Sequence, residues 1–382
     1  MNIGIISERL SQPATGIGVY TQNLIKEMSE IYPRKNLFLI DMCDREIFKE
    51  LNKIIISPSV RSLPKNSYFW HLISQIRLRK NNFNLEVVHS PENATLFLKM
   101  NNQKKVITVH DILPCLFPEL FGITAIRYKL LFRNTLKTAD KIIAISNNTK
   151  KDLIDYFKVP EDKIVVIYSA ADSKFKQLSV LEIENIKRKY HLNFPFILYV
   201  GSFMKHKNIP SLIEAFRRFH DTEHCRLNMY KLVLVGSKKW QYDEIFEMVL
   251  EFNLKDDVIF LGSVPDGDLP LLYNAASLFV YPSVYEGFGL PPLEAMACGC
   301  PVITSNSSSL PEVVGDAGLL VDTCNIDHLV DSMHKVLTNE ELRQRIIKRG
   351  LEQAKSFNWR KCAEETLEVY KSLYEKDKNV CE

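Results

Sequence analysis

Short apolar runs alternate with segments of helical periodicity along this chain, and that alternation limits the fold more than any other feature. The runs are nearly continuous in apolar residues, as is typical of strands buried on both faces of a sheet. Repeated strand–helix alternation predicts a parallel sheet covered by helices. In the first half the expected strands are residues 3–6, 37–40, 87–89, 106–109, 142–145 and 165–167, and the expected helices are about 18–31, 124–138 and 147–157.

The same pattern begins again in the second half, after a lysine-rich helix expected at about 182–190. Because 382 residues exceed the ~100–200 of an ordinary domain, we expect two α/β domains that are Rossmann-like and face a central cleft. Asn193 and Pro195 interrupt the periodicity, so the predicted domains are 1–192 and 193–358, with a helix at 359–382 crossing back to the first. The second set of strands is expected at 196–200, 232–235, 258–261, 278–281 and 302–304, with a helix at 210–219.

Composition excludes several classes of protein. No apolar run approaches the ~20 residues that a membrane-spanning helix needs. The start, MNIGIISERL, lacks the order of charged and apolar residues found in a signal peptide. The eight cysteines show no paired CxxC spacing, which argues against a zinc knuckle or a disulfide framework. We therefore expect a cytoplasmic protein with reduced thiols.

Charge is unevenly distributed between the two halves. Residues 1–190 carry 29 Lys and Arg against 19 Asp and Glu, whereas residues 191–382 carry 20 against 27. A basic half suggests an anionic partner, such as a phosphate-bearing acceptor, a membrane surface or nucleic acid. An ordinary lysine-rich surface is the alternative.

The most informative stretch is Tyr285–Pro301, YEGFGLPPLEAMACGCP. It reads as the end of a strand, a glycine loop and a helix that prolines open and Gly299 closes. The amino end of such a helix presents backbone N–H groups and a positive dipole, which suits a diphosphate. Glu286 precedes the loop, and Glu294 is expected in the first helical turn, where it can accept hydrogen bonds from a ribose diol. An ordinary strand–helix loop with solvent-facing acids is the alternative.

The spacing E-x7-E within EGFGLPPLEAMACGCPVITSNSSSLPEVVGDAGLLV resembles the signature of retaining glycosyltransferases of family 4, which have the GT-B fold. The resemblance implies that Glu286 contacts the donor sugar as a catalytic residue and that Glu294 holds the nucleotide ribose. It also implies that the loop binds sugar hydroxyls and phosphate through the backbone of Gly287, Phe288, Gly289 and Leu290.

The segment VGSFMKHKN, residues 200–208, resembles the family's diphosphate-binding loop. Lys207 matches its lysine, and the resemblance implies that this charge neutralises the leaving phosphate. The family often has arginine where Ser202 and His206 stand. Neutralisation is then expected to rest mainly on Lys207, with Lys205 as a second cation; a solvated surface lysine is the alternative. Gly236 and Val264 follow strands where the family binds the base through its backbone.

In the first half, TGIGVY resembles the family's glycine loop near the donor phosphates, with Gly16 and Gly18 as binding residues. A turn that caps a helix is the alternative. TVHDILP ends a strand, and His110 matches a family histidine near the anomeric carbon, so we predict a catalytic role. Asp111 is expected to orient His110, to face the acceptor or to cap a helix. Ser146 or Asn147 either faces the cleft or caps the helix that follows.

The resemblance implies transfer of a hexose from a nucleotide diphosphate to an acceptor with retained anomeric configuration. The resemblance to GT-B enzymes, which need no metal, implies that no metal or other cofactor is required. GDP-mannose is the first choice of donor, and a UDP-sugar is the second. The acceptor is expected to be a glycan or a lipid-linked glycan in polysaccharide biosynthesis.

Two cationic, amphipathic stretches in the first half, 68–80 and 126–137, predict peripheral binding to an anionic membrane surface. Surface helices that pack on the core are the alternative.

Three competing classes of protein are disfavoured. An NAD-dependent oxidoreductase needs a third glycine where Thr21 stands; a non-catalytic sugar-nucleotide binder would lack His110 or Glu286; and no nucleic-acid-binding motif is present.

Overall fold

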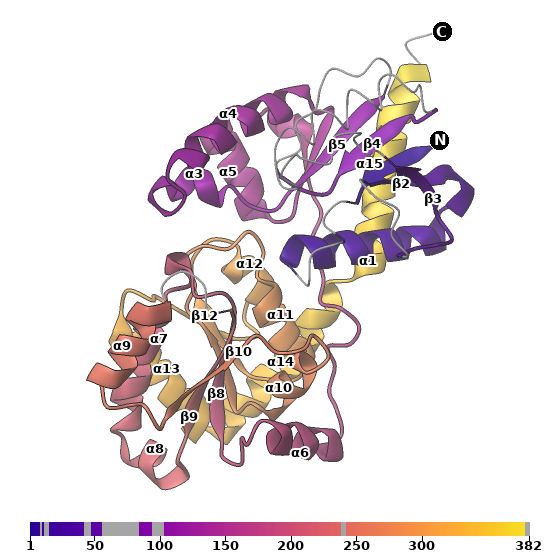
Figure 1. Cartoon of the computed structure of the whole chain (residues 1–382). Helices are drawn as coiled ribbons and strands as arrows, with labels where there is room; N and C mark the ends of the chain where they lie inside the picture. The colour runs from indigo at the N-terminus through magenta and orange to yellow at the C-terminus, as the bar shows by residue number, and fades with distance from the viewer. Residues whose placement is uncertain are drawn as a thin grey trace. The chain divides into compact units, whose positions relative to one another are not determined.

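The computed structural model describes residues 1–7, 10, 15–41, 47–55, 84–93, 103–237 and 242–378. The chain divides into two compact units (Figure 1). The first comprises Met1–Ser169 together with Trp359–Glu382, and the second comprises Ala170–Asn358. Each unit is an α/β domain built on one parallel sheet.

The first unit has a seven-stranded sheet in the order β3-β2-β1-β4-β5-β6-β7. The chain winds outward from β1 in one direction and then returns to wind in the other, so the direction reverses between β1 and β4. This is a doubly wound sheet, whose ligands bind at the carboxyl ends of the strands beside the reversal. The strands are β1 (Ile3–Ile6), β2 (Leu37–Asp41), β3 (Asn52–Ile55), β4 (Val87–Ser90), β5 (Lys104–Val109), β6 (Lys141–Ala144) and β7 (Ile164–Val166).

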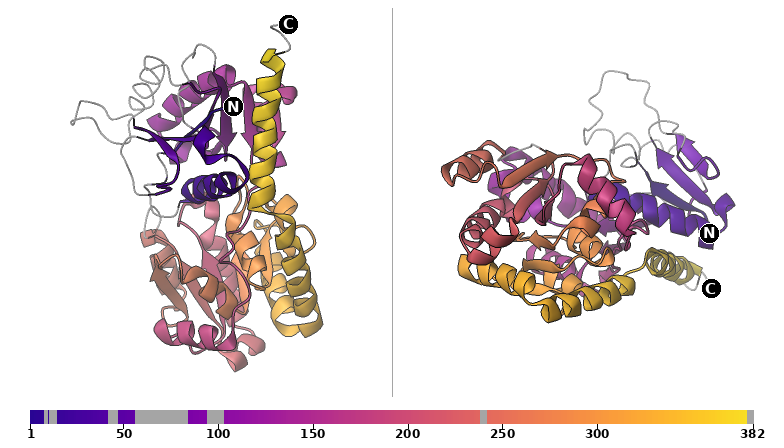
Figure 2. Two further views of the ribbon diagram at one scale, coloured as in Figure 1. Left: turned by 90° about the vertical axis from the view of Figure 1, so that its right-hand side faces the viewer. Right: turned by 90° about the horizontal axis from the view of Figure 1, so that it is seen from below.

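Helices cover both faces of this sheet. Successive side chains of a strand point to opposite faces, and apolar side chains on both faces are buried under these helices. Ile107 and Val109 of β5 pack in a core with Phe132 and Leu153 from two helices, α4 and α5. Thr108 points to the opposite face, which is covered by α1 and the C-terminal helix α15; these two helices cross and pack against each other (Figure 2). The helices are α1 (Gly16–Ile31), α3 (Leu113–Leu116), α4 (Ile123–Thr138), α5 (Asn147–Phe157) and α15 (Trp359–Lys378), with 3-10 turns at Arg34–Asn36, Pro118–Leu120 and Glu161–Lys163.

The second unit repeats the winding with six strands, in the order β10-β9-β8-β11-β12-β13, and the reversal falls between β8 and β11. Leu278 of β11 pairs with Ile197 of β8 across that point. Nearly every residue of these two strands is buried, as their continuous apolar sequences predict. The strands are β8 (Phe196–Val200), β9 (Lys231–Val235), β10 (Val258–Gly262), β11 (Leu278–Tyr281), β12 (Val302–Ser305) and β13 (Leu319–Val321).

The helices of the second unit lie between and after these strands. They are α6 (Val180–Lys189), α7 (Ile209–His220), α8 (Glu223–Asn228), α9 (Tyr242–Glu251), α10 (Leu269–Ala275), α11 (Leu290–Ala297), α12 (Leu310–Val314), α13 (Ile326–Thr338) and α14 (Glu340–Ser356), with a 3-10 turn at Lys205–Lys207. Helix α14 ends at Ser356, and α15, which belongs to the first unit, begins at Trp359.

The grouping of residues 170–192 differs from the predicted boundary after residue 192. Helix α6 packs on α10 of the second unit. Lys189 and Tyr190 both donate hydrogen bonds of 2.6 Å to Asp268. These contacts hold α6 in the second unit, so Asn193 and Pro195 lie in the connection between α6 and β8 and not at the end of a domain.

Two strands were not predicted. β3 lies at the edge of its sheet, and only Ile54 of its four residues is buried, so it lacks a continuous apolar run. β13 has three residues and two of them are half-exposed. In the part of the chain that the structure describes, no helix is long and apolar enough to cross a bilayer, and the cysteines found there are free thiols.

Candidate active site

Two loops of the second unit bring Lys207 and Glu286 together. Lys207 ends the 3-10 turn that follows β8, and Glu286 lies in the loop that follows β11. These strands flank the reversal of the sheet, where doubly wound domains bind ligands. Lys207 Nζ lies 2.6 Å from Glu286 Oε1, and each side chain is 13% exposed. The fold therefore joins two of the predicted site residues, seventy-nine positions apart in sequence, in one partly buried ion pair.

Tyr281, the last residue of β11, is a further partner of Lys207 beside Glu286. Lys207 Nζ donates a 2.8 Å hydrogen bond to the Tyr281 hydroxyl and lies 5.3 Å from the centre of its ring. Two charges taken out of water need such additional partners, because desolvation offsets much of their attraction. Tyr281 was not predicted as a site residue; its position at the carboxyl end of a central strand was the available signal.

The ion pair keeps Glu286 charged. Burial alone would raise the pKa of its carboxyl group, but the charge of Lys207 and hydrogen bonds lower it below the usual value. The neighbouring His206 is affected in the opposite sense. Burial and the positive charge of Lys207 lower the pKa of His206 to about 4, so this imidazole is neutral near pH 7. The site thus carries one fixed positive and one fixed negative charge.

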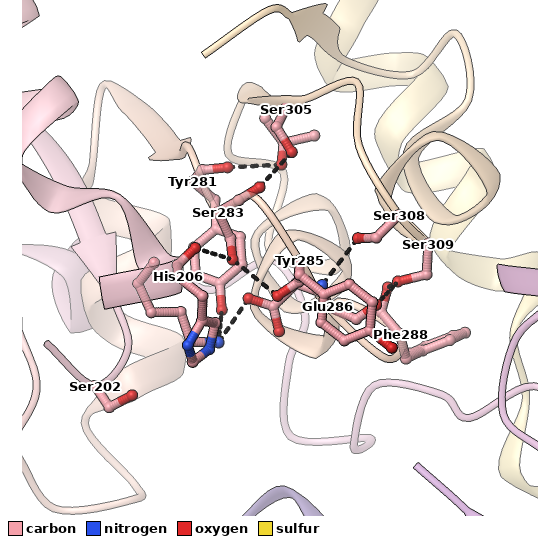
Figure 3. Close-up of polar contacts among 12 residues, drawn as sticks. Ser202, His206, Tyr281, Ser283, Tyr285, Glu286, Phe288, Ser305, Ser308 and Ser309 are labelled. Carbon is pink, nitrogen blue, oxygen red and sulfur yellow. Dashed lines mark hydrogen bonds and ion pairs between the residues drawn. The ribbon is translucent and has the colours of Figure 1, made fainter. Parts of the chain in front are cut away.

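A run of serines fixes the backbone around Glu286. The Glu286 amide donates to Ser308 Oγ at 2.8 Å, and Ser309 Oγ donates to the Glu286 and Phe288 carbonyls at 2.9 and 2.6 Å (Figure 3). Ser283 Oγ donates to the carbonyl of His206 at 3.1 Å, which ties the two loops to each other. These serines were not predicted as site residues, although Ser308 and Ser309 lie in the SNSSS run inside the motif.

Gly289 initiates helix α11 with a φ of 116°, which disfavours any residue with a Cβ. A Cβ there would also lie 2.8 Å from Leu310 Cδ2. Pro291 and Pro292 occupy the first turn, as predicted, and carry no N–H. The backbone donors at this helix end are therefore those of Leu290 and the loop before it, fewer than a helix without prolines would offer.

The expectation that Glu294 lies in the first turn of the helix is wrong. The helix begins at Leu290, so Glu294 is its fifth residue and the first turn holds no acid. The Glu294 carboxyl group lies too far from the amino end of the helix to be stabilised by the helix dipole. Burial is therefore the main influence on this group, and it raises the pKa of Glu294 to about 7. Tyr273 donates a 3.1 Å hydrogen bond to Glu294 Oε2 and lowers this pKa only in part.

The other predicted donor-binding positions of this unit lie on the loops after β8, β9 and β10. The Ser202 carbonyl accepts a 3.0 Å hydrogen bond from Tyr199, and Figure 3 shows its side chain apart from the Glu286 cluster. Gly236 allows a close approach of two loops, because a Cβ there would lie 1.9 Å from the Gly201 carbonyl oxygen. Val264 is half-buried in the loop after β10.

His110 directly follows β5 in the first unit and is 8% exposed. Its Nε2 lies 2.8 Å from the Pro91 carbonyl oxygen, which can only accept, so this nitrogen carries the proton. Its backbone amide donates to Asn93 Oδ1 at 2.7 Å. Burial lowers the pKa of His110 to about 4, so it is a neutral imidazole with Nδ1 as its acceptor.

A buried hydrogen-bond network lies beside His110. Tyr20, whose ring meets that of His110 edge to face at 4.9 Å, bonds to Thr108 Oγ1 at 3.2 Å. Thr108 bonds to His89 Nε2 at 2.8 Å, and His89 Nδ1 bonds to the Tyr370 hydroxyl of α15 at 2.5 Å. Burial lowers the pKa of His89 to about 3, so the network is neutral. Its members come from α1, β5, β4 and α15, and spacing in the sequence gives no signal for such long-range partners.

Three of the alternative roles weighed from sequence are capping roles that the structure contains. Thr15 Oγ1 accepts from the Gly18 amide, so Gly16 and Gly18 lie in the first turn of α1. Asp111 Oδ1 accepts from the Leu113 amide at the start of α3. Ser146 Oγ accepts from the Thr149 amide and is the N-cap of α5.

Of the two cationic stretches, residues 68–80 lie outside the described residues, and residues 126–137 belong to α4. Part of α4 packs on the core, as the alternative interpretation required, through Tyr128 and Phe132. Its outer face nevertheless exposes Ile126 and Leu130, by 62% and 66%. Within the described ranges, no group of three or more His, Cys, Asp or Glu side chains is arranged to hold a metal ion.

Two Rossmann-like domains with fully parallel sheets define the GT-B class of glycosyltransferases, and this chain has that fold. It is similar to sucrose-phosphate synthase of Thermosynechococcus elongatus, with a TM-score of 0.80 and 21% identity over 98% of this chain and 99% of that one. It is also similar to HepE of Anabaena, solved in complex with UDP and glucose, with a TM-score of 0.77 and 19% identity over 97% and 100%.

Sequence comparison identifies the family. The family described as "Glycosyl transferases group 1" matches residues 182–353, and "Glycosyltransferase Family 4" matches residues 14–175. The O-antigen chain mannosyltransferase B of Escherichia coli is 33% identical over 387 residues, which cover 98% of this chain and 100% of that protein. The chain belongs to this glycosyltransferase family and is an enzyme of that class.

Proposed function

We propose that this enzyme transfers mannose from GDP-mannose to a glycan or lipid-linked glycan acceptor during polysaccharide synthesis. The observation that carries the proposal is the partly buried Lys207–Glu286 ion pair on the two loops beside the sheet reversal. The mannosyl group is inferred from the similarity to an O-antigen chain mannosyltransferase over the whole chain. A UDP-sugar is the second candidate donor, since HepE, of the same fold, was solved with UDP and glucose.

In the proposed reaction, Lys207 and the amides of Phe288, Gly289 and Leu290 bind the diphosphate. Negative charge grows on this group as its bond to the anomeric carbon breaks, and preorganised donors stabilise such charge without reorganising. Glu286 binds hydroxyls of the mannosyl group, and Glu294 binds the ribose diol. Ser202, Gly236 and Val264 contribute backbone contacts to the nucleotide. We propose that these donors serve in place of a metal ion.

We propose that anomeric configuration is retained through displacement on one face of the sugar. The bond between the anomeric carbon and the diphosphate oxygen breaks, the acceptor oxygen bonds to that carbon on the same face, and the acceptor proton moves to the leaving phosphate. His110 is proposed to contact the transferred sugar as a neutral imidazole, and Gly16 and Gly18 to approach the phosphates. Exclusion of water limits hydrolysis of the donor.

We further propose that the enzyme works in the cytoplasm, at the surface of the membrane that carries a lipid-linked acceptor. The exposed apolar and cationic face of α4 supports this proposal. Vesicle flotation tests it directly, and absence of binding to anionic vesicles would contradict it.

A thermal-shift series with GDP, UDP, ADP and their mannose and glucose conjugates tests the donor. GDP and GDP-mannose are expected to give the largest rise in melting temperature, because ligand binding to the native state stabilises it by mass action. A larger rise with UDP compounds would show that a UDP-sugar is the donor in place of GDP-mannose.

Proton NMR of the sugar released from GDP-mannose tests the stereochemistry. The α-anomer is expected to form first, and initial formation of the β-anomer would overturn the proposal of retention.

A further inference from the structure

A cationic cavity of about 360 Å³ lies in the first unit, away from the strand ends that bear His110. It is formed where α4 and α5 end and where the 3-10 turn Glu161–Lys163 begins β7. β6 begins at Lys141, just after α4 ends, so these segments lie at the amino ends of the strands. His110 follows the last residue of β5, at the carboxyl ends. In a parallel sheet the amino ends and the carboxyl ends of the strands lie on opposite sides of the domain, so the cavity is separate from the candidate active site.

Four cationic side chains line the cavity: Arg133, Lys137, Lys158 and Lys163. Lys163 donates to the Leu136 and Lys137 carbonyls at 2.8 and 3.0 Å, which stabilises the negative end of α4. The charges of Asp140 and Asp162 also act on Lys163.

The other three cations remain available to a ligand. Across the described residues, Arg133, Lys137 and Lys158 make no side-chain hydrogen bond or ion pair, and no carboxylate from that set lines the cavity. The dipoles of α4 and α5 place about half a negative charge at the carboxyl end of each helix, which offsets only part of this positive charge. The cavity therefore suits an anion with more than one oxygen, such as a phosphate ester.

The cavity also has an apolar side. Leu136, Phe157 and Val159 line it and are 3%, 9% and 7% exposed. A ligand that fills the cavity thus has an anionic group beside an apolar portion.

The surface next to the cavity decides between a soluble phosphate and a lipid. Ile123, Ile126 and Leu130 of α4 are 68%, 62% and 66% exposed. At 3.6 residues per turn they share one face of the helix with Arg133 and Lys137, which lie three and seven residues beyond Leu130. An apolar row that ends in a cationic cavity matches a lipid, whose chains and phosphate head group are joined in one molecule.

We propose that this cavity binds the phosphate head group of an anionic membrane lipid while the apolar row of α4 enters the acyl region. The inference rests on the membrane association proposed above and adds a specific head-group site to it. A soluble phosphate ester is the competing occupant, and it has no need of the exposed row.

The test compares two pairs of substitutions in the full chain. Arg133→Ala with Lys137→Ala removes two cations of the cavity. Arg127→Ala with Lys151→Ala removes two exposed cations from the same two-helix region but outside the cavity, and is the matched control. Binding is measured by flotation with vesicles of phosphatidylcholine, alone and mixed with phosphatidylglycerol. Thermal shift with glycerol 1-phosphate and with inorganic phosphate is measured at constant ionic strength.

Each variant loses two cations, so the loss of diffuse attraction to an anionic surface weakens membrane binding in both variants alike. The cavity variant is expected to bind phosphatidylglycerol vesicles about tenfold more weakly than the control, and to lose the thermal shift given by glycerol 1-phosphate. Equal loss in both variants would overturn the proposal. So would protection by inorganic phosphate alone, with vesicle binding unchanged in the cavity variant.

A failure here is distinguishable from a failure of the proposed enzymatic function. The thermal shift given by GDP-mannose is expected to be the same in wild type and both variants, because neither pair belongs to the candidate active site. Absence of all vesicle binding, with the GDP-mannose shift intact, would overturn the membrane proposals and leave the transferase assignment standing.

Discussion

The two units wind their sheets alike but bury different chemistry beside the point where the winding reverses. The second unit buries charges: Lys207 and Glu286 lie 2.6 Å apart. The first unit buries neutral groups, of which His110 and His89 have pKa values lowered to about 4 and about 3. The same doubly wound topology thus contains a charged site in the second unit and an uncharged site in the first.

This difference in buried charge indicates different roles for the ion pair of the second unit and the neutral network of the first. A buried ion pair is weak evidence for stability, because desolvation offsets the attraction of its partners. Lys207 and Glu286 are therefore better explained by a ligand that brings charge of its own. A neutral network with satisfied hydrogen bonds specifies one arrangement of a core instead. We expect substitutions in the second unit to affect catalysis most and those in the network of the first to affect stability most.

The largest effect is expected from Lys207→Ala. Loss of a cation aimed at the leaving phosphate should lower kcat/KM for mannosyl transfer by about 10²–10³. Lys205→Ala is the matched control, since Lys205 belongs to the same 3-10 turn and is exposed. It should lower the rate by less than about threefold. Comparable losses in both variants would show that the loop carries a diffuse charge and not a single positioned cation.

The network of the first unit gives the next largest effect. Tyr370→Phe leaves His89 Nδ1 buried without the Tyr370 hydroxyl, so the free energy of unfolding should fall by about 1–3 kcal/mol in urea titrations. Tyr156→Phe removes a hydroxyl from a tyrosine that is 36% exposed and should change it by under about 0.5 kcal/mol. If the two variants were equally stable, the network would not be what holds α15 on the sheet.

A third prediction concerns pH and Glu294, whose pKa is raised to about 7 by burial. If its ionised carboxylate binds the ribose, protonation below pH 7 weakens GDP binding by about tenfold per pH unit. Affinity should therefore rise with pH and level off above about 7 in calorimetric titrations. Glu294→Gln should bind weakly and lose this dependence, which separates it from titration of the nucleotide phosphates. A wild-type profile that is parallel to that of the variant would remove Glu294 from the donor site.

The smallest effect is expected from titration of His110. Since burial lowers its pKa to about 4, it stays neutral from about pH 5 to 8. The profile of kcat at saturating donor should then show no step near pH 6.5. A step there that disappears in His110→Gln would mean that the imidazole takes up a proton during turnover, unlike the neutral group described above.

Sequence reasoning found most strands because buried parallel strands are continuous apolar runs, and β1, β8 and β11 have the predicted bounds. It placed Lys207 and Glu286 on the correct loops because strand ends and glycines mark such loops. It failed where packing decides. The domain boundary depended on Asp268 binding the end of α6, and the environment of Glu294 depended on the residue at which α11 begins. Tyr281, Ser308 and Ser309 take part through contacts that only the folded chain creates.

The most direct test of the account is a crystal structure of the enzyme with GDP-mannose. The account predicts the diphosphate at the loops after β8 and β11, with Lys207 Nζ within hydrogen-bond distance of a phosphate oxygen and the mannosyl hydroxyls at Glu286. A nucleotide bound elsewhere, or one held at these loops without contact to either side chain, would contradict it.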